Sequence, residues 1–244
     1  MVSSIIVEIR AGAGGDEASI FARDLFEMYS KYAQLQNWRC FVLDANYSDL
    51  NGLKQITFEL KGENVLQKMK YEAGVHRVQR VPQTEKNNRL HTSTVSVAVL
   101  VRPPETEIIK INPSEIKMDF YKSSGPGGQN VNKRQTAVRI THLPSGLVVC
   151  SQVERGLEDN KRAALTILQT KLFEMKKNAA QNQILQERKI QIGKMERAEK
   201  IRTYNFPQDR LTDHRVGKSW HNLEKIMRGK LDDVVSKLQE TLKD

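Results

Sequence analysis

The chain has 244 residues, 28% of them charged and 39% hydrophobic, so it can bury a core and is not a disordered tail. Its 39 lysines and arginines outnumber its 29 acidic residues, which gives a net charge of +10 at pH 7. The sequence contains no apolar run of about 18 residues and no secretory signal pattern, which excludes a membrane-spanning helix. Two cysteines (Cys40 and Cys150) and five histidines without metal-ligand spacing exclude a disulfide scaffold, and we expect neither a metal nor a cofactor.

The excess positive charge is concentrated in one stretch. Residues 161–204 hold 11 basic and 4 acidic side chains, a net charge of +7. A basic segment of this size beside a nearly neutral body indicates a polyanionic partner, most often nucleic acid. The alternative is a solvated helix whose charges only keep the chain soluble.

The first part of the chain is predicted to be an α+β domain of the α/β sandwich-like kind. An amphipathic helix is expected to begin at Asp16 and Glu17, whose charges complement the positive end of its dipole. Repeated strands beside one long helix favour a largely antiparallel sheet. The alternation of apolar and polar residues predicts these strands at 5–10, 38–43, 55–60, 75–81 and 94–101.

A second, smaller unit of mixed sheet and long helix is expected from residue 112, after a proline-rich boundary at 102–105. Its helix, about 157–189, is predicted to bury Leu165, Leu168, Leu172 and Met175. We therefore expect a domain at 1–111, packed with a helical segment at 205–244, and a domain at 112–204 that ends in a hinge. The other predicted elements are strands at 117–121, 137–143 and 147–153, and short helices at 221–227 and 231–242.

A glycine-rich loop separates the first two strands of that second unit. Its residues 125–129 read Gly-Pro-Gly-Gly-Gln, without the spacing of a phosphate-binding loop and without a nucleophile and base pair. Any chemistry would come from backbone N–H groups and a neutral amide, which can position water and stabilise negative charge. Such a loop suits hydrolysis of an activated ester in a pocket that another molecule completes. The alternative is an ordinary flexible β-loop.

The motif Gly127-Gly128-Gln129, followed by Asn130-Val131-Asn132, resembles the GGQ motif of class I peptide chain release factors. The resemblance covers essentially the whole chain, but not the helical domain that precedes this part in the family. It implies that one domain reads a stop codon on the small ribosomal subunit and the other directs water to the peptidyl-tRNA ester. Further matching segments lie at 10–18, 74–82, 91–94, 201–208 and 212–215.

The resemblance assigns catalysis to Gly127, Gly128 and Gln129, where the glutamine backbone N–H stabilises the transition state and its side chain helps to admit water. It also implies N5-methylation of Gln129 by a dedicated methyltransferase. The implied partners are both ribosomal subunits with their RNA, the mRNA stop codon, peptidyl-tRNA and a recycling GTPase. We expect a cytoplasmic monomer, or one in an organellar matrix if a transit peptide has been removed, that acts only on the ribosome rather than as a free-standing enzyme.

Codon reading is carried over by motif position. The first base would meet the helix start at Gly14 and Glu17, Thr84 would contact the first two bases, and His91 would separate the second from the third. The hydroxyl of a threonine offers a donor and acceptors, and an imidazole can stack on an exposed RNA base. Without the resemblance, the simpler interpretation of His91 is a histidine in a turn whose hydrogen bonds are made within that turn.

The third base would be read by Gln79 and Thr92, with Pro82, Gln83 and Leu90 completing the site. The form Pro82-Gln83-Thr84 resembles the loop of the type that reads UAA and UAG, although the family usually has a small apolar residue in the place of Gln83. On its own, Gln79 would be a surface amide on a strand.

Two rival functions remain open from the sequence. Segment 154–161 differs from the family pattern, which affects contacts to ribosomal RNA. One rival is a rescue hydrolase for stalled ribosomes with weak codon dependence; the other is a non-catalytic RNA-binding protein. The codon loop argues against the first rival and the intact Gly127-Gly128-Gln129 against the second.

Overall fold

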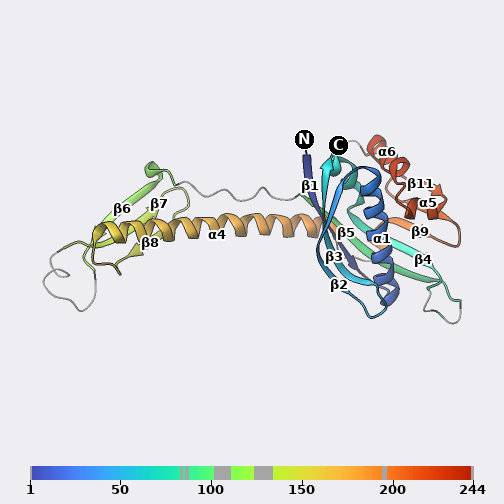
Figure 1. The fold of residues 1–244 in the computed structure, drawn as a ribbon, viewed down its shortest axis with the longest axis horizontal. Coiled ribbons are helices and arrows are strands. Elements are labelled where there is room, and N and C mark those ends of the chain that lie inside the picture. Colours follow the sequence, from blue (N-terminus) through green and yellow to red (C-terminus); the bar gives the residue numbers. More distant parts are fainter. Residues whose placement is uncertain are drawn as a thin grey trace. The chain divides into compact units, whose positions relative to one another are not determined.

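The computed structural model describes residues 2–82, 85, 88–101, 111–123, 134–193 and 197–242. They form two compact units, one made of residues 1–102 and 184–244 and the other of residues 103–183 (Figure 1). The chain thus leaves the first unit and returns to it. The boundaries expected from the sequence, 111/112 and 204/205, both lie further along the chain than these limits.

The first unit is built on one large sheet. The strand order is β11-β10-β9-β4-β5-β1-β3-β2 among the described residues. All neighbouring strands are antiparallel except β4 and β9, which run parallel, so the predicted α+β class with a largely antiparallel sheet is confirmed. The strands are β1 (Val2–Ala11), β2 (Arg39–Tyr47), β3 (Leu53–Glu63), β4 (Gly74–Arg80), β5 (His91–Val101), β9 (Lys200–Asn205), β10 (Arg210–Asp213) and β11 (Lys218–His221).

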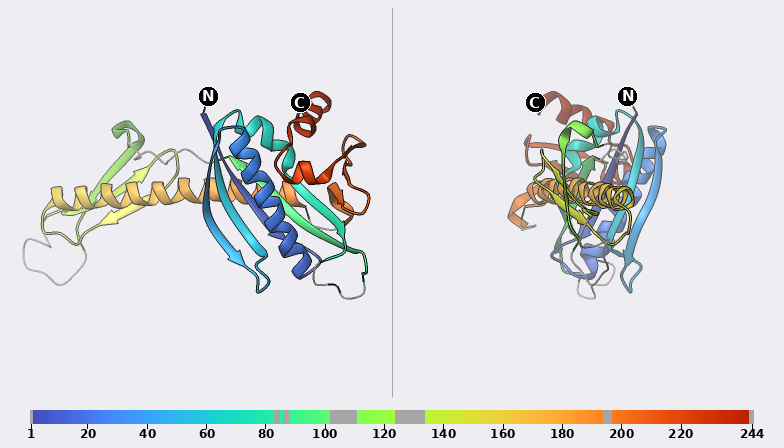
Figure 2. Two further views of the ribbon diagram at one scale, coloured as in Figure 1. Left: turned by 45° about the vertical axis from the view of Figure 1, so that its right-hand side comes forward. Right: turned by 90° about the vertical axis from the view of Figure 1, so that its left-hand side faces the viewer.

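Helix α1 (Asp16–Leu35) lies across one face of this sheet (Figures 1 and 2). Its apolar side chains, such as Phe21 and Leu25, are fully buried and share one core with β1, β3 and β5. Burial of such side chains stabilises the fold by about 1.5–3 kcal/mol each. The same core includes side chains from α2 (Val65–Met69), α5 (Leu223–Met227) and α6 (Asp232–Thr241).

A buried ionic network joins the C-terminal strands to the rest of the unit. The Arg202 side chain is fully buried, donates from Nε to Asp213 Oδ2 at 2.9 Å, and donates from Nη2 to Glu72 Oε1 at 2.8 Å. Tyr29 on α1 donates to the other Glu72 oxygen at 2.9 Å. Burial alone would raise the pKa of Glu72, but Arg202 lowers it below its ordinary value. The carboxylate is therefore ionised and paired, because an unpaired buried charge would be strongly destabilising.

The C-terminal segment is more strand-rich than predicted. The predicted helix at 221–227 is wrong at its start: β11 runs through His221, and α5 begins at Leu223. The segment expected to form the hinge, residues 191–204, contains most of β9, whose residues pair in parallel with β4. These strands are four to six residues long and rich in basic and hydroxyl side chains, so they lack the apolar alternation that marks a strand in the sequence.

The second unit has a small antiparallel sheet in the order β6-β7-β8, formed by β6 (Ile116–Tyr121), β7 (Ala137–His142) and β8 (Val148–Ser151). Helix α4 (Leu157–Ile192) covers it with a stripe of Ala164, Leu168 and Leu172. The expectation that Met175 is buried in this stripe is wrong, because its exposed fraction is 47%. Among the described residues, the apolar cluster between α4 and the sheet ends at Leu172 along the helix and does not include Met175.

Candidate functional site

The first predicted site element is the turn that leads from β1 into α1. The N–H of Gly12 donates to the carbonyl of Thr94 at 2.8 Å, and the N–H of Thr94 donates to the carbonyl of Ala13 at 2.9 Å. Gly14 has a φ of +134°, and a Cβ there would lie 2.2 Å from the hydroxyl of Ser93. Only glycine fits at this position. The turn is thus fixed to β5 while Gly14 stays exposed at its outer side.

Glu17, in the first turn of α1, is 3% exposed and is held by Arg80 at the end of β4. Arg80 Nε donates to Glu17 Oε1 at 2.5 Å, and Arg80 Nη1 donates to Asp24 Oδ2 at 2.7 Å. The Arg80 guanidinium also lies 5.1 Å from the ring centre of Phe206. Because the Glu17 carboxylate is buried and bound to Arg80 through Oε1, it does not face outward, whereas the backbone at Gly14 and Gly15 and the Asp16 side chain are exposed.

Gln79 and Thr92, predicted to act together, lie directly opposite one another on β4 and β5. Both are half-buried. The side-chain amide of Asn205 donates to Gln79 Oε1 at 3.4 Å, and the N–H of Phe206 donates to the Gln79 carbonyl at 3.0 Å. β9 therefore orients the Gln79 side chain through Asn205, and the N–H of Phe206 holds the Gln79 backbone.

His91 follows the loop between these two strands and pairs with Arg80 in the sheet register. Its Nε2 lies 2.6 Å from Oε2 of Glu85, whose side chain is only 7% exposed, and Arg89 reaches the same oxygen at 3.4 Å. The carboxylate of Glu85 thus fixes the imidazole of His91 while the ring remains 41% exposed. Pro82 is buried and Leu90 is 53% exposed.

The structure brings together Gly14, Glu17, Gln79, Thr92 and His91 at one edge of the first unit. At this edge α1 begins, β4 ends and β5 starts (Figure 2). Gln83 and Thr84 lie outside the described residues, as do Gly127, Gly128 and Gln129.

Three further residues shape this edge that the sequence did not indicate, namely Arg80, Glu85 and Asn205. Arg80 alternates with Gln79 along β4, so it points to the opposite face of the sheet, toward α1. The alternation of side chains along β4 is the one sequence signal from which the contact of Arg80 with α1 could have been inferred.

In the second unit, Asn160 in the first turn of α4 joins the start of β7 to the end of β8. It is fully buried, and its side-chain amide donates to the carbonyls of Thr136 at 2.9 Å and Glu154 at 2.8 Å. Its oxygen accepts from the hydroxyl of Ser151 and the N–H of Glu154, both at 3.0 Å. Asn160 lies in the segment that departs from the family pattern, and its own role is structural.

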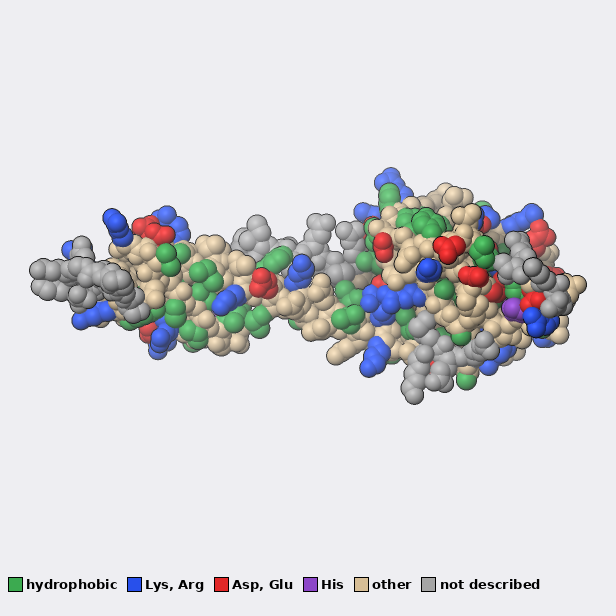
Figure 3. Space-filling view, turned by 90° about the horizontal axis from the view of Figure 1, so that it is seen from below, with side chains coloured by type: hydrophobic (Ala, Val, Ile, Leu, Met, Phe, Trp, Pro, Cys, Tyr) green, Lys and Arg blue, Asp and Glu red, His purple; other side chains and the backbone are tan. Residues whose placement is uncertain are grey.

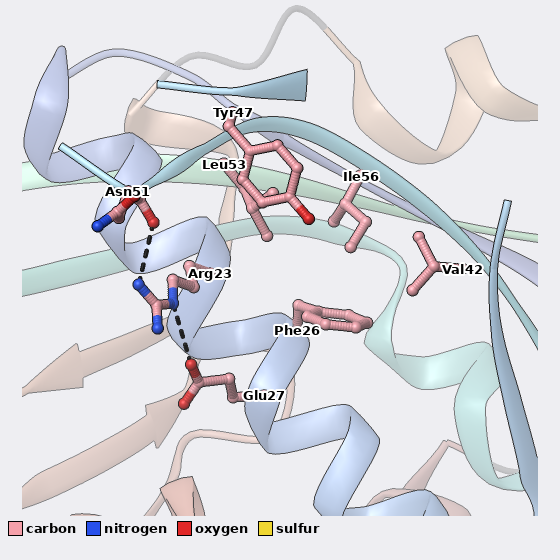
Figure 4. A pocket seen from close by; sticks show the side chains of 8 residues that line it. All are labelled: Arg23, Phe26, Glu27, Val42, Tyr47, Asn51, Leu53 and Ile56. Atoms are coloured by element: carbon pink, nitrogen blue, oxygen red, sulfur yellow. Dashed lines mark hydrogen bonds and ion pairs between the residues drawn. The ribbon is translucent and has the colours of Figure 1, made fainter. Parts of the chain in front are cut away.

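A pocket of about 400 Å³ lies between α1 and the β2–β3 hairpin (Figure 4). Its polar side is the pair Arg23–Glu27, with Arg23 Nε 3.0 Å from Glu27 Oε1 and Arg23 Nη1 donating to the carbonyl of Asn51 at 3.1 Å. The lining offers no nucleophile with a base beside it, so this pocket is not a centre for acyl chemistry. The other lining residues are Phe26, Val42, Tyr47, Leu53 and Ile56.

On the surface, Lys and Arg side chains are spread over the face in Figure 3 rather than gathered in one patch. Among the described residues, no group of three or more His, Cys, Asp and Glu is arranged to hold a metal ion. In the same part of the chain, no helix is long and apolar enough to cross a membrane.

Two family models match the chain, the PCRF domain over residues 2–97 and the RF-1 domain over residues 104–215. The two matches define a class of protein in which a PCRF domain is followed by an RF-1 domain. Peptide chain release factor 1 of Acetivibrio thermocellus is 49% identical over 98% of this chain, and that of Thermotoga maritima is 51% identical over 96%. The chain belongs to the peptide chain release factor family.

The chain spans 66% of the length of the Acetivibrio relative and 68% of the Thermotoga relative, about two thirds in each case. Among solved structures, RF2 of Thermus thermophilus is similar with a TM-score of 0.58 and 33% identity, over 96% of this chain and 66% of that one. The resemblance seen in the sequence motifs is thereby confirmed.

Proposed function

We propose that this chain is a translation termination factor that reads the stop codons UAA and UAG in the ribosomal A site and triggers hydrolysis of the peptidyl-tRNA ester. The observation that carries the proposal is the edge of the first unit. There the Gln79–Thr92 pair, the His91 imidazole and the glycine turn at Gly14 lie where β4 ends and β5 begins. The relatives named peptide chain release factor 1 support the same function.

The chemistry of this edge suits single-stranded RNA. Gln79 and Thr92 offer donors and acceptors to a base edge, and the exposed ring of His91 can stack on a purine. The first base would contact the exposed backbone at Gly14, because the carboxylate of Glu17 is held by Arg80. Pro82, Gln83, Thr84 and Leu90 would complete the site.

Hydrolysis is assigned to Gly127, Gly128 and Gln129. A backbone N–H aimed at the developing oxyanion stabilises the transition state without an acid or base on the protein. The glutamine backbone would supply that N–H, its side chain would help to admit water, and the ribosome would complete the pocket. The proposal therefore includes both ribosomal subunits with their RNA, the mRNA stop codon and peptidyl-tRNA as partners. It also includes a methyltransferase acting on Gln129, a recycling GTPase, and a monomeric protein in the cytoplasm or an organellar matrix.

A release assay tests the proposal. Ribosomes that carry labelled peptidyl-tRNA and present UAA, UAG, UGA, a sense codon or an empty A site are mixed with the chain, and free peptide is measured. We expect release at UAA and UAG only. Release from the empty A site at the rate seen with UAA would instead support a rescue hydrolase, and no release at any codon would contradict catalysis.

A further inference from the structure

A row of polar side chains continues from the Gln79–Thr92 pair across the sheet. In the strand register Gln79 on β4 is paired with Asn205 on β9, Asn205 with Arg210 on β10, and Arg210 with His221 on β11. Directly paired residues on neighbouring strands point to the same face of a sheet. We call Asn205, Arg210 and His221 the downstream row.

Hydrogen bonds within the sheet support this shared face. Asn205 reaches Gln79 at 3.4 Å within the row. In the next row along the strands, Arg77 Nε donates to the hydroxyl of Thr203 at 3.1 Å, and the hydroxyls of Thr212 and Ser219 are 2.9 Å apart. The face is therefore polar over five neighbouring strands, from β5 to β11.

The charge of the downstream row favours an anion. None of its three residues is acidic, and the adjacent row contributes another cation, Arg77. Arg210 Nη2 donates to Gln208 Oε1 at 2.6 Å, while its Nε is buried and has no hydrogen-bond partner. Nε itself is out of reach of a ligand, but the half-buried guanidinium carries five N–H donors, so its terminal N–H groups can bind a further acceptor such as a phosphate. His221 is exposed beside it and can stack on a base.

We infer that the downstream row binds the mRNA nucleotide that follows the stop codon. The inference rests on the proposed function, in which Gln79 and Thr92 contact the third codon base. The next nucleotide is covalently joined to that base's sugar and phosphate. With strands about 4.8 Å apart, Arg210 lies about 10 Å and His221 about 14 Å across the sheet from Gln79. Arg210 would bind the connecting phosphate and His221 the base.

The test compares two mRNAs, one that ends directly after UAA and one that continues by several nucleotides. Peptide release by the unaltered chain, Arg210→Gln and His221→Ala is measured on both, and KM is separated from kcat. The matched control is Lys218→Gln, which removes one charge from β11 on the opposite face, where Lys218 is paired with the buried Asp213.

We expect Arg210→Gln and His221→Ala to raise KM on the longer mRNA by about twofold to fivefold, as for loss of one exposed charged or stacking contact. On the mRNA that ends at the codon, both variants should match the unaltered chain. Lys218→Gln should behave like the unaltered chain on both. For Arg210→Gln on the longer mRNA, the slope of log affinity against log salt should fall by about 1.

If KM rises equally on both mRNAs in both variants, the inference is overturned and the contact is made to ribosomal RNA instead. If KM is unchanged on both mRNAs in both variants, the inference is also overturned. A folding defect in Arg210→Gln lowers release on both mRNAs alike, in which case His221→Ala, altered at an exposed side chain, decides. Release by the unaltered chain on the shorter mRNA tests the proposed function separately. Its absence would contradict that function rather than the assignment of the row.

Discussion

The side-chain amide of Gln191 forms two hydrogen bonds with the backbone of Val99, as a neighbouring strand would. The N–H of Val99 donates to Gln191 Oε1 at 2.9 Å, and Gln191 Nε2 donates to the Val99 carbonyl at 2.8 Å. β4 pairs with β5 only as far as Val97, so Val99 lies at an open edge of β5. Nearby, Arg188 is ion-paired with Glu8. The last turns of α4, which belong to the first unit, are thus held to its own sheet.

Gln191→Ala should free this attachment. Two hydrogen bonds of about 0.5–1.5 kcal/mol each would be lost, so we expect the free energy of unfolding of the first unit to fall by about 1–3 kcal/mol. The sharper measurement is hydrogen exchange, in which the amide of Val99 should exchange faster in the variant. Gln186→Ala, an exposed change on the same helix, is the control. Unchanged protection of Val99 would show that the amide does not hold α4 to β5.

His76 should make the stability of the first unit depend on pH. Burial, followed by the charge of Arg202, lowers the pKa of His76 from 6.5 to about 4. Its Nε2 lies 2.8 Å from the carbonyl of Glu72, so the neutral ring donates there. Between pH 6.5 and 4, His76 is protonated in the unfolded chain but stays neutral in the folded chain. Stability present above pH 6.5 is therefore lost as the pH falls toward 4, by about 3 kcal/mol in all.

The variant His76→Gln should lose this dependence, and urea unfolding between pH 7 and 5 measures it. The pKa of Glu72 lies below 4.5, so its own contribution is lost only at lower pH. Partial burial also lowers the pKa of His214, which acts in the same direction and is unchanged in the variant. If the unaltered chain and His76→Gln lose equal stability over that interval, another group carries the dependence.

The N-terminal fold could be predicted because its elements have clear local patterns. The apolar alternation of β1 and the acidic start of α1 at Asp16 are visible in the sequence, and both elements are confirmed. The strands β9 to β11 could not be predicted in the same way. They depend on pairing with β4, more than a hundred residues away, and on the buried ion pairs of Arg202, a residue type that composition places on the surface.

At the site, the sequence motifs indicated which residues gather but not what holds them. Gln79 and Thr92 were expected to act on one base, and the register places them opposite one another. No local pattern indicated that Glu17 is buried against Arg80 or that Glu85 holds His91, because each pair joins residues that are apart in the sequence. Contacts of this kind depend on tertiary packing, which no local periodicity records.

Gly128→Ala should abolish ester hydrolysis and leave ribosome binding nearly unchanged. A Cβ at this position would restrict the backbone and obstruct its close approach to the ester. Loss of one oxyanion donor costs about 100-fold to 1000-fold in rate, so single-turnover release at UAA should fall by at least that much. Binding to UAA-programmed ribosomes, measured in parallel, is the control. Release near the unaltered rate would show that this loop is not the catalytic element.

Thr84→Val should change codon choice rather than release in general. The Thr84 hydroxyl can accept a hydrogen bond from the amino group of adenine at the second position, whereas guanine presents an acceptor there. Valine keeps the shape and removes that acceptor, at a cost of about 1–3 kcal/mol, or roughly 5-fold to 150-fold in release at UAA and UAG. Residual release at UGA should fall less.

The matched control for this variant is Gln83→Ala in the same loop. If Gln83 points away from the codon, as we expect, that change leaves the ratio of release at UAA to release at UGA unaltered. A lower ratio in Thr84→Val but not in Gln83→Ala would assign second-base reading to the threonine hydroxyl. Efficient release at UGA by the unaltered chain, or a ratio that stays the same in Thr84→Val, would mean that discrimination of the second base comes from elsewhere, with His91 and its partner Glu85 the next residues to vary.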